Sequence, residues 1–309
     1  MSAISPSLQN KPFTGLTKGN GTIMKTRKCI PAVLKAAAFF LAMMLLLVLL
    51  WAVLPYPVNP ALRQLRRQLA EDGCIIHAGG YLTLSDGTRV SYTNSLEALE
   101  NCWQNGKRFC EIDLQETMDG TLICGHGDEK ELVFGTGLPT TASGADFLSC
   151  RIYGEFTPLT VEDLAAFMRG HPGFYVFTDV KSDNLRVCRR LAEAFPDLRS
   201  RFIVQIQLPE EYETLRELGF PYITYPIFKT PDEQRGLLRL TAFAENHELL
   251  ALILPNGYYS PDSKLYLAEE LIRTPLILHT LNDNWEIEYY LRNHMALAVY
   301  TDRTDFEQR

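Results

Sequence analysis

The fold is decided by the stretch from Cys74 to Gly127, which contains Cys74-Ile-Ile-His-Ala-Gly-Gly80, Phe109-Cys-Glu-Ile-Asp-Leu114 and Cys124-Gly-His-Gly127. The middle piece predicts a buried strand on which Glu111 and Asp113, two residues apart, point to the same face. Two carboxylates on the inward face of an apolar strand cost free energy unless a cation or a charge partner compensates them. Hard divalent cations such as Mg²⁺ and Ca²⁺ prefer sites built from oxygen atoms, so this piece predicts a metal site.

The two flanking pieces each add a histidine to these carboxylates. The turn signal Asp119-Gly120 predicts a hairpin with a two-residue turn, which would place His126 opposite Asp113. His77 ends a short apolar strand and is followed by Gly79-Gly80, where the backbone can approach a ligand closely. Two imidazoles and two carboxylates at strand ends indicate general acid–base chemistry beside a metal.

With these pieces in place, the sequence resembles the glycerophosphodiester phosphodiesterases and, more broadly, the phospholipase C-like phosphodiesterases. That family has, in order, a His-Arg-Gly strand, an Asn-Thr element, a Glu-x-Asp strand, a Thr-x-Asp-Gly turn, a His-Asp strand end and a Glu-x-Lys strand. The matching pieces here are His77 with Gly79, Thr93-Asn94-Ser95, Glu111-Ile112-Asp113, Thr117-Met118-Asp119-Gly120, His126 and Asp179-Val180-Lys181. Weaker matches at 279–283 and 300–302 carry the resemblance to the end of the chain.

The resemblance implies a role for each of these side chains. Glu111, Asp113 and Asp179 would hold one divalent cation, Mg²⁺ or Ca²⁺. His77 and His126 would act as general base and acid, in an order that the sequence leaves open. Lys181 shares a strand face with Asp179, and we favour a contact with a non-bridging phosphate oxygen over a purely structural ion pair.

The chain departs from the family pattern at three positions. Ala78 stands where the family has an arginine near the phosphate, so a bidentate donor is lost and the substrate class is in doubt. Asp179 replaces a longer glutamate, and Gly127 separates His126 from Asp128. The last two departures are compatible with the same chemistry. Asp128, Glu129 and Glu131 are near enough in sequence to reach the metal, although a solvated acidic loop is the simpler interpretation.

Segments of strand and helix character alternate from Lys181 to the end of the chain, which indicates βαβ units and a parallel sheet. Nine strands are expected in all. If the His126 strand is the return arm of a hairpin, eight parallel strands remain, the number of a (β/α)₈ TIM barrel. We therefore expect an α/β barrel over 73–309, with its site at the carboxyl ends of the strands. The segments expected after Lys181 are 185–194, 202–205, 210–218, 222–225, 231–246, 251–254, 263–273, 276–280, 285–293 and 298–301.

The N-terminal part has a different composition. Residues 1–35 contain no Asp or Glu and carry six Lys and Arg residues, as expected of a basic, disordered cytoplasmic tail. Residues 36–54 are wholly apolar and match the thickness of a bilayer core, which predicts a transmembrane helix, followed by a juxtamembrane linker over 55–72 with a short amphipathic helix. A cleaved signal peptide is the alternative, but no small-x-small cleavage site follows Leu54.

The distribution of charged residues predicts on which side of the membrane the barrel lies and which class of partner is excluded. Lysine and arginine precede the apolar run, which favours a cytoplasmic N-terminus in a single-pass cell-membrane protein with the barrel outside the cytoplasm. The chain after residue 35 has 24 basic and 37 acidic residues, so its formal charge of −13 argues against nucleic acid as a partner. Cysteines form no Cys-x-x-Cys pair, and we expect mostly free buried thiols.

The sequence as a whole predicts a membrane-anchored, divalent-metal-dependent phosphodiesterase. Its substrate would be a glycerophosphodiester, a phospholipid head group or a glycerol-phosphate polymer. Two alternatives stay open: phospholipase C- or D-like cleavage of a phospholipid head group, and a non-catalytic protein that binds phosphoesters without turning them over.

Overall fold

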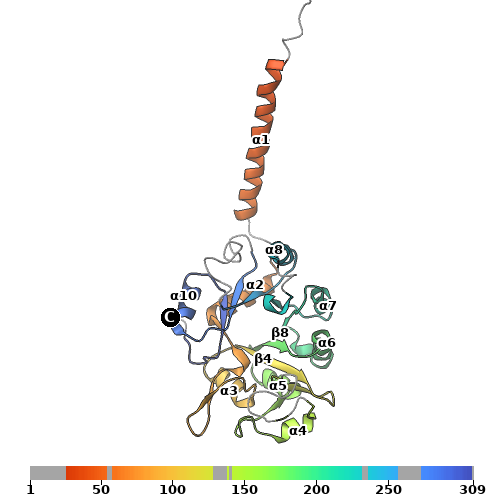
Figure 1. Ribbon diagram of the computed structural model, residues 1–309, viewed down its shortest axis with the longest axis vertical. Coiled ribbons are helices and arrows are strands. Elements are labelled where there is room, and N and C mark those ends of the chain that lie inside the picture. Colours follow the sequence, from red (N-terminus) through yellow and green to blue (C-terminus); the bar gives the residue numbers. More distant parts are fainter. Residues whose placement is uncertain are drawn as a thin grey trace, which may run out of the picture. The chain divides into compact units, whose positions relative to one another are not determined.

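The computed structural model describes residues 26–53, 58–127, 138, 141–231, 236–256 and 273–307 (Figure 1). The chain divides into two compact units, Met1–Tyr56 and Pro57–Arg309, and each is described by itself. The second unit begins well before residue 73, where the sequence predicts the barrel domain to start, so it includes most of the expected linker over 55–72.

The first unit contains the helix α1 (Thr26–Val53). The helix begins inside the segment 1–35 that was expected to be disordered, because lysine and arginine before the apolar run are themselves good helix formers. Its side chains are described from Val33 to Val48, whereas residues 1–25 and Leu54 lie outside the described residues. No helix in the described residues has both the length and the apolar character that crossing a membrane requires, so the predicted span over 36–54 is not found there.

The second unit is built on a closed barrel of parallel strands. The first strand pairs in parallel with both the last strand and its next barrel neighbour, which closes the sheet. Eight strands form this circle among the described residues, so the expected (β/α)₈ barrel is confirmed. They are, in chain order, β1 (Cys74–Ile76), β4 (Phe109–Glu116), β7 (Tyr175–Val180), β8 (Phe202–Gln205), β9 (Ile223–Pro226), β10 (Ala251–Pro255), β11 (Leu276–His279) and β12 (Ala298–Thr301).

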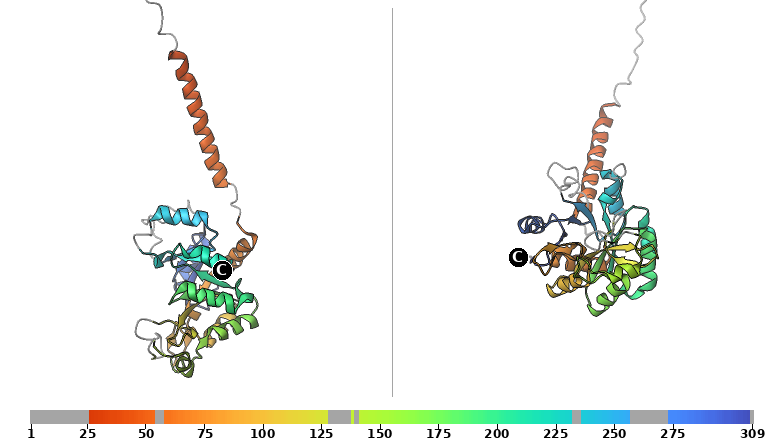
Figure 2. Two further views of the ribbon diagram at one scale, coloured as in Figure 1. Left: turned by 90° about the vertical axis from the view of Figure 1, so that its right-hand side faces the viewer. Right: turned by 60° about the horizontal axis from the view of Figure 1, so that its bottom comes forward.

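Helices lie outside the strands, as the views in Figures 1 and 2 show. Their first residues follow side-chain caps that the sequence supplies: Ser95 accepts from Ala98 N, and Thr160 forms a capping box with Asp163. The helix expected over 263–273 lies outside the described residues except for Arg273. The described outer helices are α3 (Leu96–Gln104), α5 (Val161–Gly170), α6 (Asn184–Ala194), α7 (Glu211–Glu217), α8 (Leu237–Asn246) and α10 (Asn284–Arg292).

Helix α2 (Pro60–Asp72) closes the N-terminal end of the barrel. It ends directly before β1 and buries three leucines, Leu62, Leu65 and Leu69, which explains the amphipathic pattern of this segment. These leucines share one buried cluster with side chains from several strands, among them Ile75, Phe109, Phe177, Ile203, Ile253, Ile277 and Tyr300. One end of the barrel interior is therefore apolar and filled, which leaves the opposite end for polar side chains.

The hairpin after β4 differs from the expected one by a single residue. The strand β5 (Leu122–Cys124) pairs Cys124 with Leu114, and Gly125 N donates to Asp113 O. Gly125 thus takes the place opposite Asp113 that was predicted for His126. The turn has three residues, because Thr117 N bonds Thr121 O and Gly120 adopts a left-handed φ of 81°.

Shorter elements complete the second unit. A two-stranded hairpin forms the expected excursion after the first strand. The expected free thiols are confirmed for the described cysteines of this unit. The short elements are η1 (His77–Gly79), β2 (Leu82–Thr83), β3 (Arg89–Val90), α4 (Gly144–Ser149), β6 (Leu159–Thr160), η2 (Pro196–Leu198) and η3 (Ile227–Lys229).

Candidate active site

Three carboxylates meet inside the barrel at the carboxyl ends of two neighbouring strands. Glu111 and Asp113 share a face of β4, and Asp179 lies beside Asp113 in the register of β4 with β7. One carboxylate oxygen from each of the three lies within 4.8 Å of the others. The predicted cluster is therefore brought together by strand parity and by the pairing of β4 with β7.

Glu111 is held as a hydrogen-bond acceptor in a dry environment. Ala78 N donates to Glu111 Oε2 over 2.8 Å, and Ala78 takes a left-handed φ of 47° to do so. Burial and the neighbouring charge of Asp113 raise the pKa of Glu111 to about 8. In the absence of a cation this carboxyl group therefore keeps its proton at neutral pH.

Asp113 is fixed by the residues that begin α3. Asn94 Nδ2 donates to Asp113 Oδ2 over 2.9 Å, and Asp113 N donates to Asn94 Oδ1 over 3.0 Å. This reciprocal pair gives a structural role to the Thr93-Asn94-Ser95 piece. The other carboxylate oxygen, Asp113 Oδ1, pairs with Lys181 Nζ at 2.9 Å.

Asp179 carries two lysines, one on each oxygen. Lys181 Nζ lies 2.9 Å from Oδ2, and Lys229 Nζ contacts Oδ1. Burial opposes ionisation of Asp179, but the two ammonium groups outweigh it and lower its pKa to about 2. Lys229 was not predicted from the sequence, because it follows β9, far along the chain from the Asp179-Val180-Lys181 piece.

His77 is oriented by an acid from the other end of the chain. Its Nδ1 lies 2.9 Å from Asp302 Oδ1, and Asn282 Nδ2 donates to Asp302 Oδ2 over 2.6 Å. Burial alone would lower the pKa of His77, but the hydrogen bond to Asp302 and the nearby Glu111 outweigh it and raise the pKa. Because Nδ1 faces Asp302, Nε2 is the ring nitrogen that can exchange a proton with a substrate.

The second histidine lies on the other side of a tyrosine. The Tyr92 ring stands 4.6 Å from the His77 ring and 6.1 Å from the His126 ring, edge-on to both. Burial lowers the pKa of His126, the opposite direction to His77. Tyr92 was not identified from sequence, and its position shortly before Asn94 was the one available signal.

A third imidazole, His279, completes this side of the site. Its ring centroid lies 4.9 Å from that of His77 and 5.6 Å from that of Phe228. Burial and the neighbouring His77 lower the pKa of His279 to about 3, so this ring is neutral at ordinary pH. The structure places the ring beside His77, within the site.

The donor set suits a hard divalent cation. Three carboxylate oxygens from rigid strands lie close together, and no sulfur or imidazole is among them. A buried carboxyl group whose pKa is raised by its acidic neighbours is a group that a bound cation would keep ionised. The residues Asp128, Glu129 and Glu131, which the sequence also offers as ligands, lie outside the described residues.

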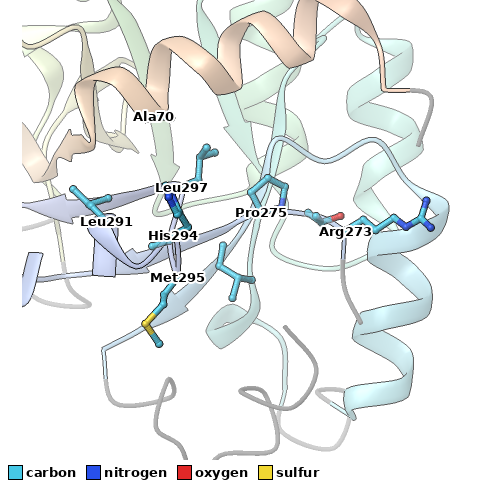
Figure 3. Close-up of a pocket in the computed structure, with 10 residues that line it drawn as sticks. Ala70, Arg273, Pro275, Leu291, His294, Met295 and Leu297 are labelled. Carbon is cyan, nitrogen blue, oxygen red and sulfur yellow. The ribbon is translucent and has the colours of Figure 1, made fainter. Parts of the chain in front are cut away.

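A separate pocket of about 470 Å³ lies elsewhere in the second unit (Figure 3). Its lining comes from the end of α2, the start of β11 and the end of α10, including Ala70, Leu276 and Leu291. The start of β11 is at the opposite end of the barrel from the carboxylates. This pocket therefore takes no part in the site described above.

Comparison with solved structures shows the fold independently. The chain is similar to a glycerophosphodiester phosphodiesterase from Thermotoga maritima, with a TM-score of 0.55 and 17% identity over 75% of this chain and 95% of the other. A glycerophosphoryl diester phosphodiesterase from Parabacteroides distasonis gives a TM-score of 0.55 and 14% identity over 77% and 88%. An Oleispira antarctica phosphodiesterase in complex with the product sn-glycerol-3-phosphate gives a TM-score of 0.52 and 16% identity, over 74% of this chain and 92% of the other.

These likenesses span nearly the whole of each solved chain and establish a common barrel fold. No family model matches the chain. The fold that the sequence resemblance implied is therefore confirmed. Because one fold hosts many activities, the activity has to be argued from the residues of the site.

Proposed function

We propose that this chain is a phosphoric diester hydrolase of the glycerophosphodiester phosphodiesterase family and depends on a divalent metal. One observation carries the proposal: acid–base groups, an oxygen-only ligand set and the ammonium group of Lys181 converge at the carboxyl ends of the barrel strands. The site residues are His77, His126, Glu111, Asp113, Asp179 and Lys181. In addition, the solved proteins with this fold include phosphodiesterases.

Proton transfer falls to the two histidines. His77 offers Nε2, because Asp302 holds Nδ1, and Asp302 stabilises the imidazolium form. The pKa values of His77 and His126 are shifted in opposite directions, so one ring is protonated and the other neutral over a common pH range. Such a pair can take a proton from the attacking hydroxyl and give one to the leaving alcohol.

Charge stabilisation falls to the groups around Asp179. Glu111, Asp113 and Asp179 would hold one Mg²⁺ or Ca²⁺, which neutralises negative charge on the phosphate. Burial and the acids around it act in opposite directions on Lys181, and Asp113 and Asp179 prevail and raise its pKa. The Lys181 ammonium therefore stays charged and can contact a non-bridging oxygen.

The attacking hydroxyl decides the reaction class. Water would give simple hydrolysis of a glycerophosphodiester, of a phospholipid head group or of a glycerol-phosphate polymer. Attack by a neighbouring alcohol of the substrate would give cyclising cleavage of a phospholipid, as in phospholipase C-like enzymes, and Ala78 in place of the family arginine favours keeping this alternative. A non-catalytic phosphoester-binding protein is the second alternative, and the complete set of acid–base groups argues against it.

Membrane attachment is part of the proposal on the strength of the sequence. The apolar run over 36–54 follows a basic segment, which favours a single pass with a cytoplasmic N-terminus and an extracytoplasmic barrel. Resistance of the full-length chain to alkaline extraction of membranes would support this. Complete release into the aqueous fraction would contradict it.

The enzymatic proposal is tested with the full-length chain purified in detergent. A panel of glycerophosphodiesters and phospholipids is assayed for released alcohol and phosphomonoester, with Mg²⁺, with Ca²⁺ and with chelator. We expect chelator-sensitive release, and the best substrate identifies the class.

Histidine variants serve as the matched control for this assay. His77→Ala and His126→Ala should each lower turnover by at least ~10², because each removes a general acid or base. His294→Ala changes an exposed histidine away from the site and should leave turnover unchanged. Near-normal rates in both site variants would refute the assignment. Binding of phosphoesters by the wild type without turnover would favour the non-catalytic alternative.

A further inference from the structure

Among the residues that the structure describes, Lys229 is a cation of the site that was not predicted from the sequence. It ends η3 (Ile227–Lys229), the short turn that directly follows β9, and its ammonium contacts Asp179 Oδ1. Its side chain keeps 18% of its surface exposed. The question is whether Lys229 is a fixed partner of Asp179 or a group that binds something else.

Asp179 has a second lysine partner besides Lys229. Lys181 already neutralises Asp179 at 2.9 Å and also pairs with Asp113 at 2.9 Å. Bringing a further ammonium group out of water has a desolvation cost that one shared carboxylate oxygen repays poorly. Asp179 therefore has two ammonium partners, one of which, Lys181, it shares with Asp113.

The two lysines differ in how firmly they are held. Lys181 bridges two acids from adjacent strands, and its backbone N donates to Leu114 O. Among the described residues, the ion pair recorded for Lys229 is with Asp179 alone. When Asp179 gives an oxygen to a divalent cation, Lys229 is the lysine whose ammonium can leave at the smaller cost.

The backbone that carries Lys229 is held in place by its neighbours, so a change of partner requires movement of the side chain alone. Ile227 and Thr230 on either side of it are buried, and Thr230 Oγ1 lies 2.6 Å from Tyr225 OH. Phe228 lies against the ring of His279, which also contacts the rings of His77 and Tyr300. Lys229 therefore links two parts of the site: its side chain contacts Asp179, and its neighbour Phe228 packs on His279 beside His77.

Charge counting points to the same role. A bound cation would keep all three carboxylates ionised, and these acids with the two lysines would then carry one negative charge before the cation itself is counted, while the His77–Asp302 pair is neutral as an ion pair. A divalent cation would convert this to one positive charge, which matches the single negative charge of a phosphodiester. Without Lys229 the same set would be neutral and would attract that anion less.

We propose that Lys229 exchanges Asp179 for a non-bridging phosphate oxygen when cation and substrate bind, and that it is a substrate-binding residue of this site. The inference rests on the proposed function, because it names the group that receives the phosphate. Lysine binds phosphate as a point charge, so a swinging ammonium group is sufficient for this task.

The test compares Lys229→Met with the wild type, because methionine keeps much of the length of the stem and removes the charge. Binding of sn-glycerol 3-phosphate, in the presence of Ca²⁺, and binding of Ca²⁺ alone are measured by calorimetry, and KM and kcat are measured on the best substrate. We expect the Kd for glycerol phosphate and the KM to rise about tenfold or more, because a charge-assisted hydrogen bond is lost. Ca²⁺ should bind equally well or more tightly, since its competitor at Asp179 is gone.

Two further variants make the result specific. Arg186→Met removes the same charge from an ion pair with Glu116 outside the cluster and should change none of these values. Lys229→Arg keeps a cation and should recover part of the lost affinity. If Lys229→Met does not fold, Lys229→Gln, which can still donate to Asp179, is measured in its place with the same expected results.

Three results would overturn the inference. Lys229→Met could bind glycerol phosphate as the wild type does, or it could lose Ca²⁺ and phosphate affinity together, as a structural partner of Asp179 would. A wild type that binds no glycerol phosphate would also overturn it. A wild type that binds glycerol phosphate but turns over no substrate refutes the proposed function alone, and the binding data still decide the role of Lys229.

Discussion

Individual side chains of the site depend on partners that are distant in sequence. His77 is the clearest case, because its orientation is set by Asp302, which Asn282 holds in turn through two further hydrogen bonds. A histidine whose Nδ1 faces a carboxylate has a fixed tautomer and a stabilised imidazolium form. The orientation of His77, which follows the first strand of the barrel, therefore depends on Asp302, which follows the last strand.

Replacement of Asp302 by Asn tests this control. We expect Asp302→Asn to lower kcat by roughly 10², because the carboxylate that stabilises the His77 imidazolium is lost. Since burial alone lowers the pKa of His77, the limb of the pH–rate profile that reports this ring should move to lower pH. Asp305→Asn, which alters an exposed partner of Arg303, is the control and should leave both rate and profile unchanged. An unshifted profile in Asp302→Asn would contradict the orienting role.

Glu111 gives a second prediction at the scale of one residue. Burial and Asp113 raise its folded-state pKa from 4.5 to about 8, so ionisation of Glu111 opposes folding in the metal-free protein. The free energy of unfolding of the wild type should therefore fall as pH rises from 4.5 to about 8. Glu111→Gln has no carboxyl group to ionise at this position, so it should not show this decrease. With chelator present, the stability of the variant relative to wild type should thus increase with pH over this window.

The same variant should bind metal poorly. We expect the affinity of Glu111→Gln for Mg²⁺ or Ca²⁺ to fall at least ~10-fold, because a charged ligand is lost. Urea unfolding across pH and calorimetric metal titration provide the two measurements. Glu97→Gln changes a carboxylate that bonds Thr157 outside the cluster and serves as the control. A metal affinity equal to wild type in Glu111→Gln would remove this residue from the ligand set.

At the scale of elements, the hairpin from β4 to β5 shows how local backbone chemistry sets the register. Gly120 has a φ of 81° that other residues adopt only at a cost, and it is what turns the expected two-residue turn into a three-residue one. Asp119 Oδ1 accepts from Thr117 Oγ1 and from Gly144 N, so the turn is also fixed from outside. This one extra residue places Gly125, and not His126, opposite Asp113.

Alanine at this glycine should weaken the hairpin. Gly120→Ala is expected to cost about 1–2 kcal/mol of unfolding free energy, because an added Cβ disfavours the left-handed conformation. The space itself is adequate, since the nearest atom to that Cβ would be Glu116 Oε1 at 3.7 Å. Gly170→Ala, at the end of α5 with nothing within 4 Å and no positive φ, should be neutral or slightly stabilising. Equal urea midpoints for both variants would contradict the explanation.

At the scale of the whole barrel unit, the two ends of the interior have opposite characters. The N-terminal end is filled by leucines of α2, and the carboxyl end holds the charged cluster. A dry, packed floor beneath the carboxylates lowers the local dielectric and strengthens every charge interaction above it. Helix α2 is therefore part of the packed interior of the barrel unit.

Truncation of one leucine tests the contribution of α2. Leu65→Ala should destabilise the protein by about 2–5 kcal/mol, because it leaves a cavity between α2 and the floor of the barrel. Leu148→Ala, which shortens a leucine that is 44% exposed, should change the unfolding free energy little. The measurement is urea unfolding followed by circular dichroism. A small effect of Leu65→Ala would mean that α2 is only a linker, as the sequence first predicted.

Much of the site was determined by the sequence itself. Strand parity places Glu111 and Asp113 on one face, and alternation of strand and helix predicts the parallel barrel. The order of the pieces at His77, His126 and Asp179 then predicts a shared end of that barrel. These inferences succeed because they depend on local backbone geometry and on a chain order that short connections preserve.

Tertiary structure alone decided the rest. The contacts of Asp302 with His77 and of Lys229 with Asp179 join residues that are distant in sequence, and no local pattern marks them. The position of Tyr92 between two histidines and the packing of α2 under the barrel are also consequences of closure. A closed sheet brings its first and last strands together, and the partners that this creates follow from three-dimensional packing, which spacing along the chain does not encode.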